Sequence, residues 1–193
     1  FQYFGVPDEV DYSNIPWRSS RFDEAELTKA VATTSRAGNA LEQYRKRAGE
    51  RTLAFCCSQR HADFMVDYFS QAGVKAVAVH SGPTSAPRAS ALEALAAGQI
   101  AVIFAVDMFN EGLDLPNVDT VLMLRPTEST SLWQQQFGRG LRRSEGKHQL
   151  RVIDYIGNHR SFLVKIRALL EPLLNIQGSD AEISAALGLL QQG

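Results

Sequence analysis

The chain has 193 residues, 45% of them hydrophobic, which suits one ordinary domain with a buried core. Its formal net charge of −1 excludes a global attraction to nucleic acid, so any such binding must come from local charge. The adjacent cysteines Cys56 and Cys57 fit neither a CxxC zinc pair nor a disulfide framework, and no apolar stretch is long enough to span a bilayer, so we expect a cytoplasmic protein without a membrane partner.

The first part of the chain is predicted to be irregular and then helical. Residues 1–22 are expected to form an irregular lead-in, because prolines and several Asp and Asn residues interrupt any regular spacing. The chain begins at Phe1 rather than Met, which we interpret as a piece of a longer protein. Residues 23–47 place apolar side chains at helical spacing, with Asp23 as N-cap, and the glycine-asparagine step at 38–39 is expected to divide or bend this helix.

From residue 52 onward, apolar runs alternate with amphipathic stretches. The expected strands are 52–57, 74–79, 100–106, 118–124 and 150–155, and the expected helices are 60–72, 86–97, 131–141 and 160–174. Strands that are apolar throughout and separated by helices favour a mainly parallel sheet with helices on both faces, a three-layer α/β domain over residues 23–175. Residues 176–193 are expected to form a C-terminal helix.

Polar loops follow four of the expected strands. In open parallel sheets, ligands collect at the carboxyl ends of the strands, so these loops are expected to converge on a composite site. The loops contain, in chain order, Ser58 with Gln59, His80 with Gly82, the stretch 107–114, and Arg125.

Two arginines lie on the helix expected after the last of these loops. Arg139 and Arg142 are three residues apart and therefore project from one helix face. The planar guanidinium suits phosphate oxygens, and arginines can stabilise the charge that develops during γ-phosphoryl transfer. A solvated basic face is the alternative, but the preceding Gln135 and the upstream Gly-Leu-Asp turn favour a phosphate site.

That upstream turn is the second candidate for nucleotide contact. Asp114 follows Gly112 by two residues and could accept a hydrogen bond from a ribose hydroxyl, although capping of the turn is the commoner role of such an Asp. His80 has no second His or Cys at ligand spacing, so no metal site is expected. The chain also lacks a G-x-x-x-x-G-K-[ST] loop and an acidic pair for magnesium, so it is not expected to hydrolyse ATP alone.

Four segments between residues 51 and 159 together resemble the C-terminal RecA-like lobe of superfamily 2 helicases. RTLAFCCSQRHAD resembles motif IV of that family, and VHSG, with Arg88 beyond it, resembles the His-Gly segment after the next strand. FAVDMFNEGLDLPNVDTVL resembles motif V, and QQFGRGLRR resembles motif VI, whose usual form is Q-x-x-G-R-x-x-R. The order and spacing of the four segments make the resemblance specific. The lead-in, with Phe4-Gly5 and Asp11-Tyr12, is similar to the restriction-enzyme-like branch.

The resemblance implies a RecA-like fold and a role for each matched residue. Arg139 and Arg142 would reach the ATP phosphates across an interlobe cleft, acting as catalytic arginines. Gly112, Asp114 and Gln135 would face the nucleotide. The residues that would follow the nucleic-acid backbone are Ser58, Gln59, His80, Gly82, Val106 and Asp107.

Three residues depart from the family pattern. Val106 stands where many relatives carry a Thr that contacts a phosphate, so that contact becomes backbone-only or is lost. Cys57 replaces a more polar residue of some relatives, and Glu111 replaces an Arg common in the DEAD branch. Motif V is therefore not of the DEAD RNA-helicase type, which favours DNA over RNA as the partner.

The leading hypothesis is the C-terminal motor lobe of an ATP-driven helicase or translocase. ATP with magnesium would be seated mainly by an N-terminal RecA-like lobe of the same polypeptide, and DNA would be the nucleic-acid partner. The alternative is a non-catalytic nucleic-acid- or protein-binding module that retains the fold. Both arginines and Asp114 argue against that alternative. A third hypothesis is an unrelated nucleotide-binding α/β domain that acts alone.

Overall fold

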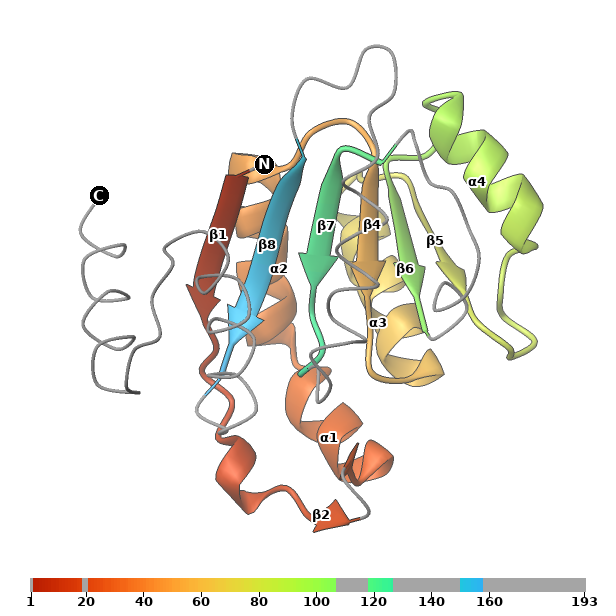
Figure 1. Ribbon diagram of the computed structural model, residues 1–193. Helices are drawn as coiled ribbons and strands as arrows, with labels where there is room; N and C mark the ends of the chain where they lie inside the picture. Colours follow the sequence, from red (N-terminus) through yellow and green to blue (C-terminus); the bar gives the residue numbers. More distant parts are fainter. Residues whose placement is uncertain (1, 19–20, 107–117, 127–149, 158–193) are drawn as a thin grey trace, which may run out of the picture.

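The computed structural model describes residues 2–18, 21–106, 118–126 and 150–157. Within these residues one sheet has the spatial order β1-β8-β7-β4-β6-β5, and every neighbouring pair is parallel (Figure 1). Its strands are β1 (Gln2–Pro7), β4 (Thr52–Phe55), β5 (Ala76–Val79), β6 (Val102–Ala105), β7 (Thr120–Met123) and β8 (Arg151–Ile156). A short antiparallel pair, β2 (Trp17–Arg18) and β3 (Arg21–Phe22), forms a separate small sheet.

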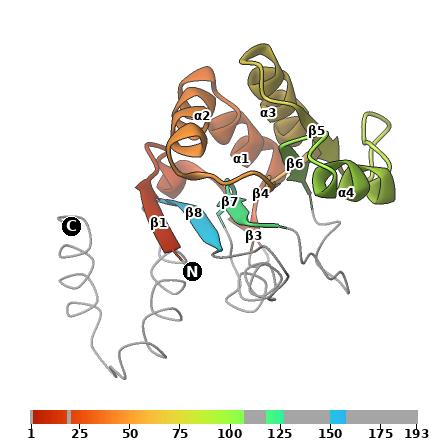
Figure 2. The same ribbon diagram turned by 90° about the horizontal axis from the view of Figure 1, so that it is seen from above.

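Helices cover both faces of the large sheet. Among the described residues these helices are α2 (Thr34–Arg47), α3 (Gln59–Gln71) and α4 (Arg88–Ala96). α1 (Glu24–Val31) lies below the lower edge of the sheet in Figure 1 and packs with residues of the lead-in, which includes a 3-10 turn at Tyr12–Asn14. Seen from above, α2 and α3 lie on one side of the sheet and α4 lies on the other (Figure 2). This parallel, three-layer arrangement confirms the predicted fold class.

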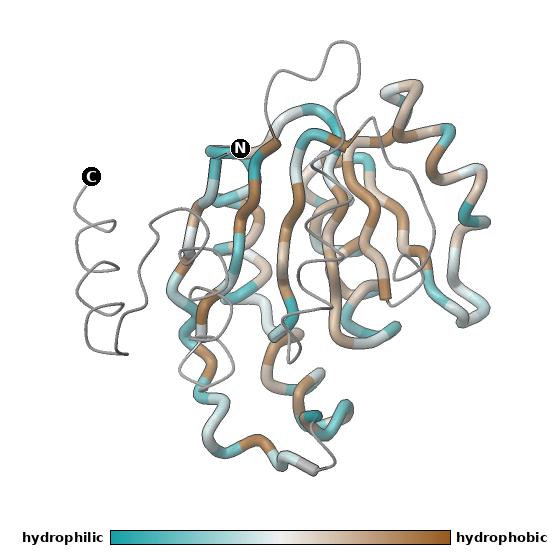
Figure 3. Tube along the Cα trace, in the orientation of Figure 1, coloured by the Kyte–Doolittle hydropathy of each residue, from teal (hydrophilic) through white to brown (hydrophobic). Residues whose placement is uncertain are grey.

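The core has two main parts, one on each face of the sheet. Because side chains alternate along a strand, Ala54 packs with α2 and α3, whereas Leu53 packs with α4. On the first face, Phe69 of α3 meets Phe104 of β6 edge-to-face, with ring centroids 5.0 Å apart. On the second face, Leu95 of α4 is fully buried. Hydrophobic residues accordingly follow the central strands (Figure 3).

Most predicted elements from residue 52 onward are confirmed. Each predicted strand among the described residues is found within its predicted range or one residue beyond it. Gly73 and Gly98, which follow α3 and α4, have left-handed φ values of 81° and 69°, the conformation that commonly ends a helix. The helices expected at 131–141, 160–174 and in the C-terminal stretch lie outside the described residues.

The irregular lead-in is wrong for its first residues. Residues 2–7 form β1, an edge strand that pairs with β8 along its whole length. Phe4 and Val6 face the α2–α3 side, while Tyr3 faces the other side. The prolines of this segment predict an irregular backbone, but Pro7 is the last residue of an edge strand, where a missing N–H disturbs no central ladder.

The expected division of the first helix occurs at a different place. α1 ends at Val31 and α2 begins at Thr34, because Thr33 is extended and caps α2 by accepting the N–H of Arg36. Gly38 lies inside α2, where a Cβ would lie 3.1 Å from the Tyr68 hydroxyl of α3. The glycine therefore permits close helix packing. The predicted N-cap Asp23 is confirmed, since its carboxylate accepts the N–H of Glu26.

Among the described residues, no helix combines the length and the apolar character needed to cross a lipid bilayer.

Candidate nucleic-acid interface

The parallel sheet brings the predicted loops to one edge. The chain leaves β4, β5, β6 and β7 at the same end of the sheet, the lower edge in Figure 1. Ser58 and Gln59 follow β4, and His80 and Gly82 follow β5. Val106 follows β6 and donates its N–H to the carbonyl of Val79 at 3.1 Å. The described residues of the predicted interface therefore share one edge, as parallel strands require.

Ser58 has a structural role at the start of α3. Its hydroxyl oxygen accepts the backbone N–H of His61 at 3.1 Å, which caps the helix, and accepts the hydroxyl proton of Thr28 at 2.6 Å. The Ser58 residue is only 5% exposed. Its hydroxyl is therefore engaged inside the protein and joins α1 to the start of α3.

Gln59 and Ser81 connect the first two loops at the surface. The Gln59 side-chain amide donates to the Ser81 hydroxyl at 2.9 Å, and both residues are exposed. Gly82 lies beneath this contact, because a Cβ there would collide with the Gln59 side chain and lie 3.0 Å from His80 Nδ1. The glycine thus leaves the space in which the two loops meet.

His80 is a buried residue that organises its own loop. Its Nδ1 accepts the N–H of Gly82 at 3.0 Å, so the neutral ring carries its proton on Nε2. Nε2 lies 3.0 Å from a carboxylate oxygen of Asp63 in α3, and the other oxygen of Asp63 accepts the Thr84 hydroxyl at 2.8 Å. The His80 side chain is only 1% exposed, so it stabilises the shape of the loop and is not accessible to a ligand at the surface.

A second histidine, His61, is wholly buried beneath the loop after β4. The Cys57 N–H donates to His61 Nδ1 at 3.4 Å, and Nε2 has no hydrogen-bond partner among the described residues. Burial lowers the pKa of His61 to about 3, helped by the positive charge of Arg36. Burial raises the pKa of Cys57, so this pair is a neutral thiol beside a neutral imidazole. It has none of the charge separation that activates a nucleophilic cysteine.

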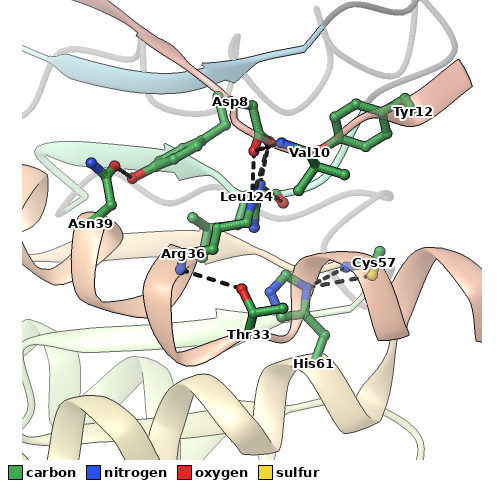
Figure 4. Close-up of polar contacts among 10 residues, drawn as sticks. Asp8, Val10, Tyr12, Thr33, Arg36, Asn39, Cys57, His61 and Leu124 are labelled. Carbon is green, nitrogen blue, oxygen red and sulfur yellow. Dashed lines mark hydrogen bonds and ion pairs between the residues drawn. The ribbon is translucent and has the colours of Figure 1, made fainter.

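A buried ion pair lies next to these loops (Figure 4). Arg36 of α2 donates through Nε and Nη2 to both carboxylate oxygens of Asp8, at 2.8 to 3.2 Å. The same Nη2 donates to the carbonyl of Leu124 at 2.9 Å, and the guanidinium carbon lies 4.8 Å from the centre of the Tyr155 ring. Tyr12 completes the group by donating its hydroxyl proton to Asp8 at 2.6 Å.

Arg36 remains charged despite its burial. Burial alone would lower the pKa of Arg36, but the hydrogen bonds and charge of Asp8 outweigh this, and the net pKa is raised. A pocket of about 220 Å³ opens beside the pair, between the end of β1 and the α1–α2 junction. Its wall includes Asn39, which accepts the Tyr155 hydroxyl.

Sequence reasoning missed two residues of this region. Asp63 could have been found, since it lies four residues after Gln59 and therefore on the same face of α3. Arg36 also had a local signal, because it lies four residues before Ala40 on the buried face of its helix. Its partners Asp8 and Leu124 had no such signal. The predicted residues Asp107, Gly112, Asp114, Gln135, Arg139 and Arg142 lie outside the described residues.

Among the described residues, no group of three His, Cys, Asp or Glu side chains is arranged to hold a metal ion.

Three comparisons place the chain among known proteins. The model of the helicase conserved C-terminal domain matches residues 36–144, more than half of the chain. The chain is 29% identical over 189 residues to IRC3 of Saccharomyces cerevisiae, covering 96% of this chain and 27% of that protein. It is 34% identical over 114 residues to the UvrABC system protein B of Tropheryma whipplei, covering 55% and 17%. It therefore spans about a quarter or less of these two relatives.

The fold is also found among solved structures. The RNA helicase Prp28 from Chaetomium thermophilum, bound to ADP, aligns with a TM-score of 0.63 at 16% identity, over 94% of this chain and 39% of that one. At this identity the likeness establishes the RecA-like fold alone.

Proposed function

The chain belongs to the family of the helicase conserved C-terminal domain, that of superfamily 2 helicases, and on this premise we propose that it is the C-terminal motor lobe of an ATP-dependent DNA helicase or translocase. In this role the lobe binds the nucleic-acid backbone with the loops at the carboxyl edge of its sheet. It also supplies arginines to an ATP site that a preceding lobe completes.

The observation that carries the proposal is the contact between the loops after β4 and β5. The Gln59–Ser81 hydrogen bond presents an amide and a hydroxyl side by side on the surface, and Thr84 adds a second exposed hydroxyl. Such neutral groups can bond phosphate and sugar oxygens without reading bases. Ser58 and His80 would contribute by holding these loops in place, because their own side chains are buried.

The nucleotide half of the proposal rests on the sequence. Gly112, Asp114 and Gln135 would face ATP, while Arg139 and Arg142 would stabilise the charge that develops on the γ-phosphate. ATP is here the substrate, held between two lobes. Closure of the lobes would bring the arginines to the phosphates, and product release would let them part.

The preference for DNA rests on Glu111, which occupies a position where the DEAD RNA-helicase branch carries Arg. Because one structural neighbour is named an RNA helicase, DNA and RNA should be compared directly. Fluorescence anisotropy of the full-length protein with single-stranded DNA and RNA of matched sequence should give the tighter binding for DNA. Tighter binding of RNA would overturn this part of the proposal.

The central experiment replaces Arg142 with Ala in the full-length protein. ATP turnover in the presence of nucleic acid should fall about 1,000-fold or more, the usual worth of an arginine at the γ-phosphate. Binding of nucleic acid, measured by anisotropy, should change less than about twofold.

Arg143→Ala is the matched control, because Arg143 lies next to the Q-x-x-G-R-x-x-R pattern but outside it. Its turnover should stay close to that of the wild type. Unchanged turnover in Arg142→Ala would refute the arginine assignment. A wild-type protein that binds nucleic acid but never hydrolyses ATP would instead support the non-catalytic module.

A further inference from the structure

The buried side chain of Arg36 joins parts of the chain that are far apart in sequence. Asp8 lies directly after β1, Arg36 lies in the first turn of α2, and Leu124 follows β7. Tyr155, whose ring lies beside the guanidinium, belongs to β8. One side chain therefore contacts the end of the N-terminal segment and the ends of two neighbouring strands (Figure 4).

The geometry of these contacts requires arginine in particular. Nε and Nη2 both donate hydrogen bonds to the Asp8 carboxylate, and Nη2 also donates one to the Leu124 carbonyl. This planar fork fixes both partners at once, whereas the ammonium of lysine is a single point of charge. Arg36 is only 7% exposed. If a shorter or less branched side chain replaced it, water could not easily take over its hydrogen bonds to Asp8 and Leu124.

The Leu124 carbonyl has a particular place in the chain. Leu124 is the first residue after β7, and the chain continues from it through Arg125 and Pro126 toward Arg139 and Arg142. Asp8 directly follows β1, in the N-terminal segment that would connect this lobe to a preceding one. Arg36 thus ties the start of this lobe to the strand end that leads to the proposed catalytic arginines.

We propose that Arg36 is a positioning residue for ATP turnover: through Asp8 and the Leu124 carbonyl, it sets where the chain leaves β7 relative to the N-terminal segment. This inference rests on the proposed function and adds a residue outside the motifs that suggested it. A displacement of about 1 Å at a reacting group can cost about 100-fold in rate, so a loosened strand end should lower kcat. Substrate affinity should change little, because Arg36 is buried and is not among the residues proposed to contact ATP or nucleic acid.

The test uses the full-length protein and its ATPase activity at saturating single-stranded DNA or RNA, whichever gives the higher wild-type rate. Arg36→Lys keeps the charge but loses the fork, and its kcat should fall about 10-fold or more. The KM for ATP and the Kd for nucleic acid should stay within about twofold. The double variant Arg36→Met with Asp8→Asn leaves no unpaired buried charge and also loses the Leu124 contact, so it should fold and show the same loss of kcat.

Tyr3→Phe is the matched control for simple weakening of the N-terminal segment. It removes the hydrogen bond from the Tyr3 hydroxyl to Asp154, at 2.9 Å, and so loosens the start of β1 without touching Leu124. It should lower the thermal midpoint, as the Arg36 variants do, but leave kcat of the folded protein unchanged.

The outcomes separate the inference from the proposed function. If kcat falls equally in Tyr3→Phe and Arg36→Lys, or in neither, Arg36 is merely structural and the inference is overturned. If the wild-type protein shows no turnover with any nucleic acid, the proposed function fails and the inference fails with it. A selective fall of kcat in the Arg36 variants supports both.

Discussion

Two buried histidines near the candidate interface have opposite surroundings. His80 uses both ring nitrogens, one toward the Gly82 N–H and one toward Asp63. His61 Nδ1 lies 3.4 Å from both the backbone nitrogen and the sulfur of Cys57, and its other nitrogen has no partner among the described residues. A buried imidazole without a counter-ion resists protonation, because its cation would lose water and gain nothing in return.

This environment of His61 predicts that acid destabilises the fold. The pKa of His61 is lowered from 6.5 to about 3, so between these values the unfolded chain binds a proton that the folded protein does not. Stability should therefore fall as pH falls from about 6.5 toward 3, by about 1.4 kcal/mol per pH unit from this residue. Urea unfolding of the isolated chain at several pH values in this window measures the slope.

His61→Asn is the control variant. Asparagine does not titrate, and its amide oxygen can still accept the Cys57 N–H. The variant should be less stable at pH 7, because it is smaller, but its stability should depend less on pH by about the same slope. An unchanged slope would show that other groups carry the acid sensitivity.

At the scale of elements, the loops after β4 and β5 contact each other through the Gln59–Ser81 hydrogen bond. α3 begins at a capped residue, so Gln59 stands at its first turn and can reach across to Ser81. Gly82 has no side chain to obstruct that contact. The interface therefore depends on one helix start and one glycine that are 23 residues apart in the chain (Gln59 to Gly82).

Replacement of Gly82 by Ala should separate the two loops. The new Cβ would collide with the Gln59 side chain, which must move and release Ser81. The Gln59 side chain is flexible at its end, and the buried His80 ring, 3.0 Å from the new Cβ, must give only slightly, so stability should fall by about 1 kcal/mol. Nucleic-acid affinity should fall about 2- to 10-fold, the worth of one hydrogen-bonding contact, as measured by anisotropy.

A double-mutant cycle tests whether the effect passes through Gln59. Gln59→Ala alone should weaken binding to a similar degree, and adding Gly82→Ala to it should have little further effect. Independent, additive losses from the two substitutions would contradict the proposed coupling between the loops.

At the scale of the whole molecule, the proposed function requires a second lobe in addition to this chain. It spans about a quarter of IRC3 and less of the UvrABC system protein B. The sequence contains no phosphate-binding loop of the G-x-x-x-x-G-K-[ST] type. Stabilising the transition state with arginines has no effect unless ATP is first held in place.

The isolated chain should therefore fold but not turn over ATP. We expect phosphate release by residues 1–193 to stay at background with or without nucleic acid, while the full-length protein is stimulated. Circular dichroism of the isolated chain checks that it is folded. Tight ATP binding with turnover by the isolated chain would favour an autonomous nucleotide-binding domain instead.

From residue 52 onward, local patterns predicted the described elements and their order correctly. Apolar runs such as 52–57 and 118–124 indicated buried parallel strands, because only a strand covered on both faces is apolar throughout. The glycines after α3 and α4 marked where those helices end. Parallel strands in turn implied that Ser58, Gln59 and His80 share one edge, which the structure confirms for these described residues.

Local patterns could not predict contacts between distant residues. Whether residues 2–7 are irregular or a strand depends on β8, which supplies the partners of β1 from the other end of the chain. The burial of His61 and the triple contact of Arg36 depend likewise on segments that meet only in the folded protein. The sequence alone determined the fold class and the edge where the loops gather, because these follow from local periodicity. The tertiary structure alone decided which of those side chains face solvent, since burial is a property of the packed whole.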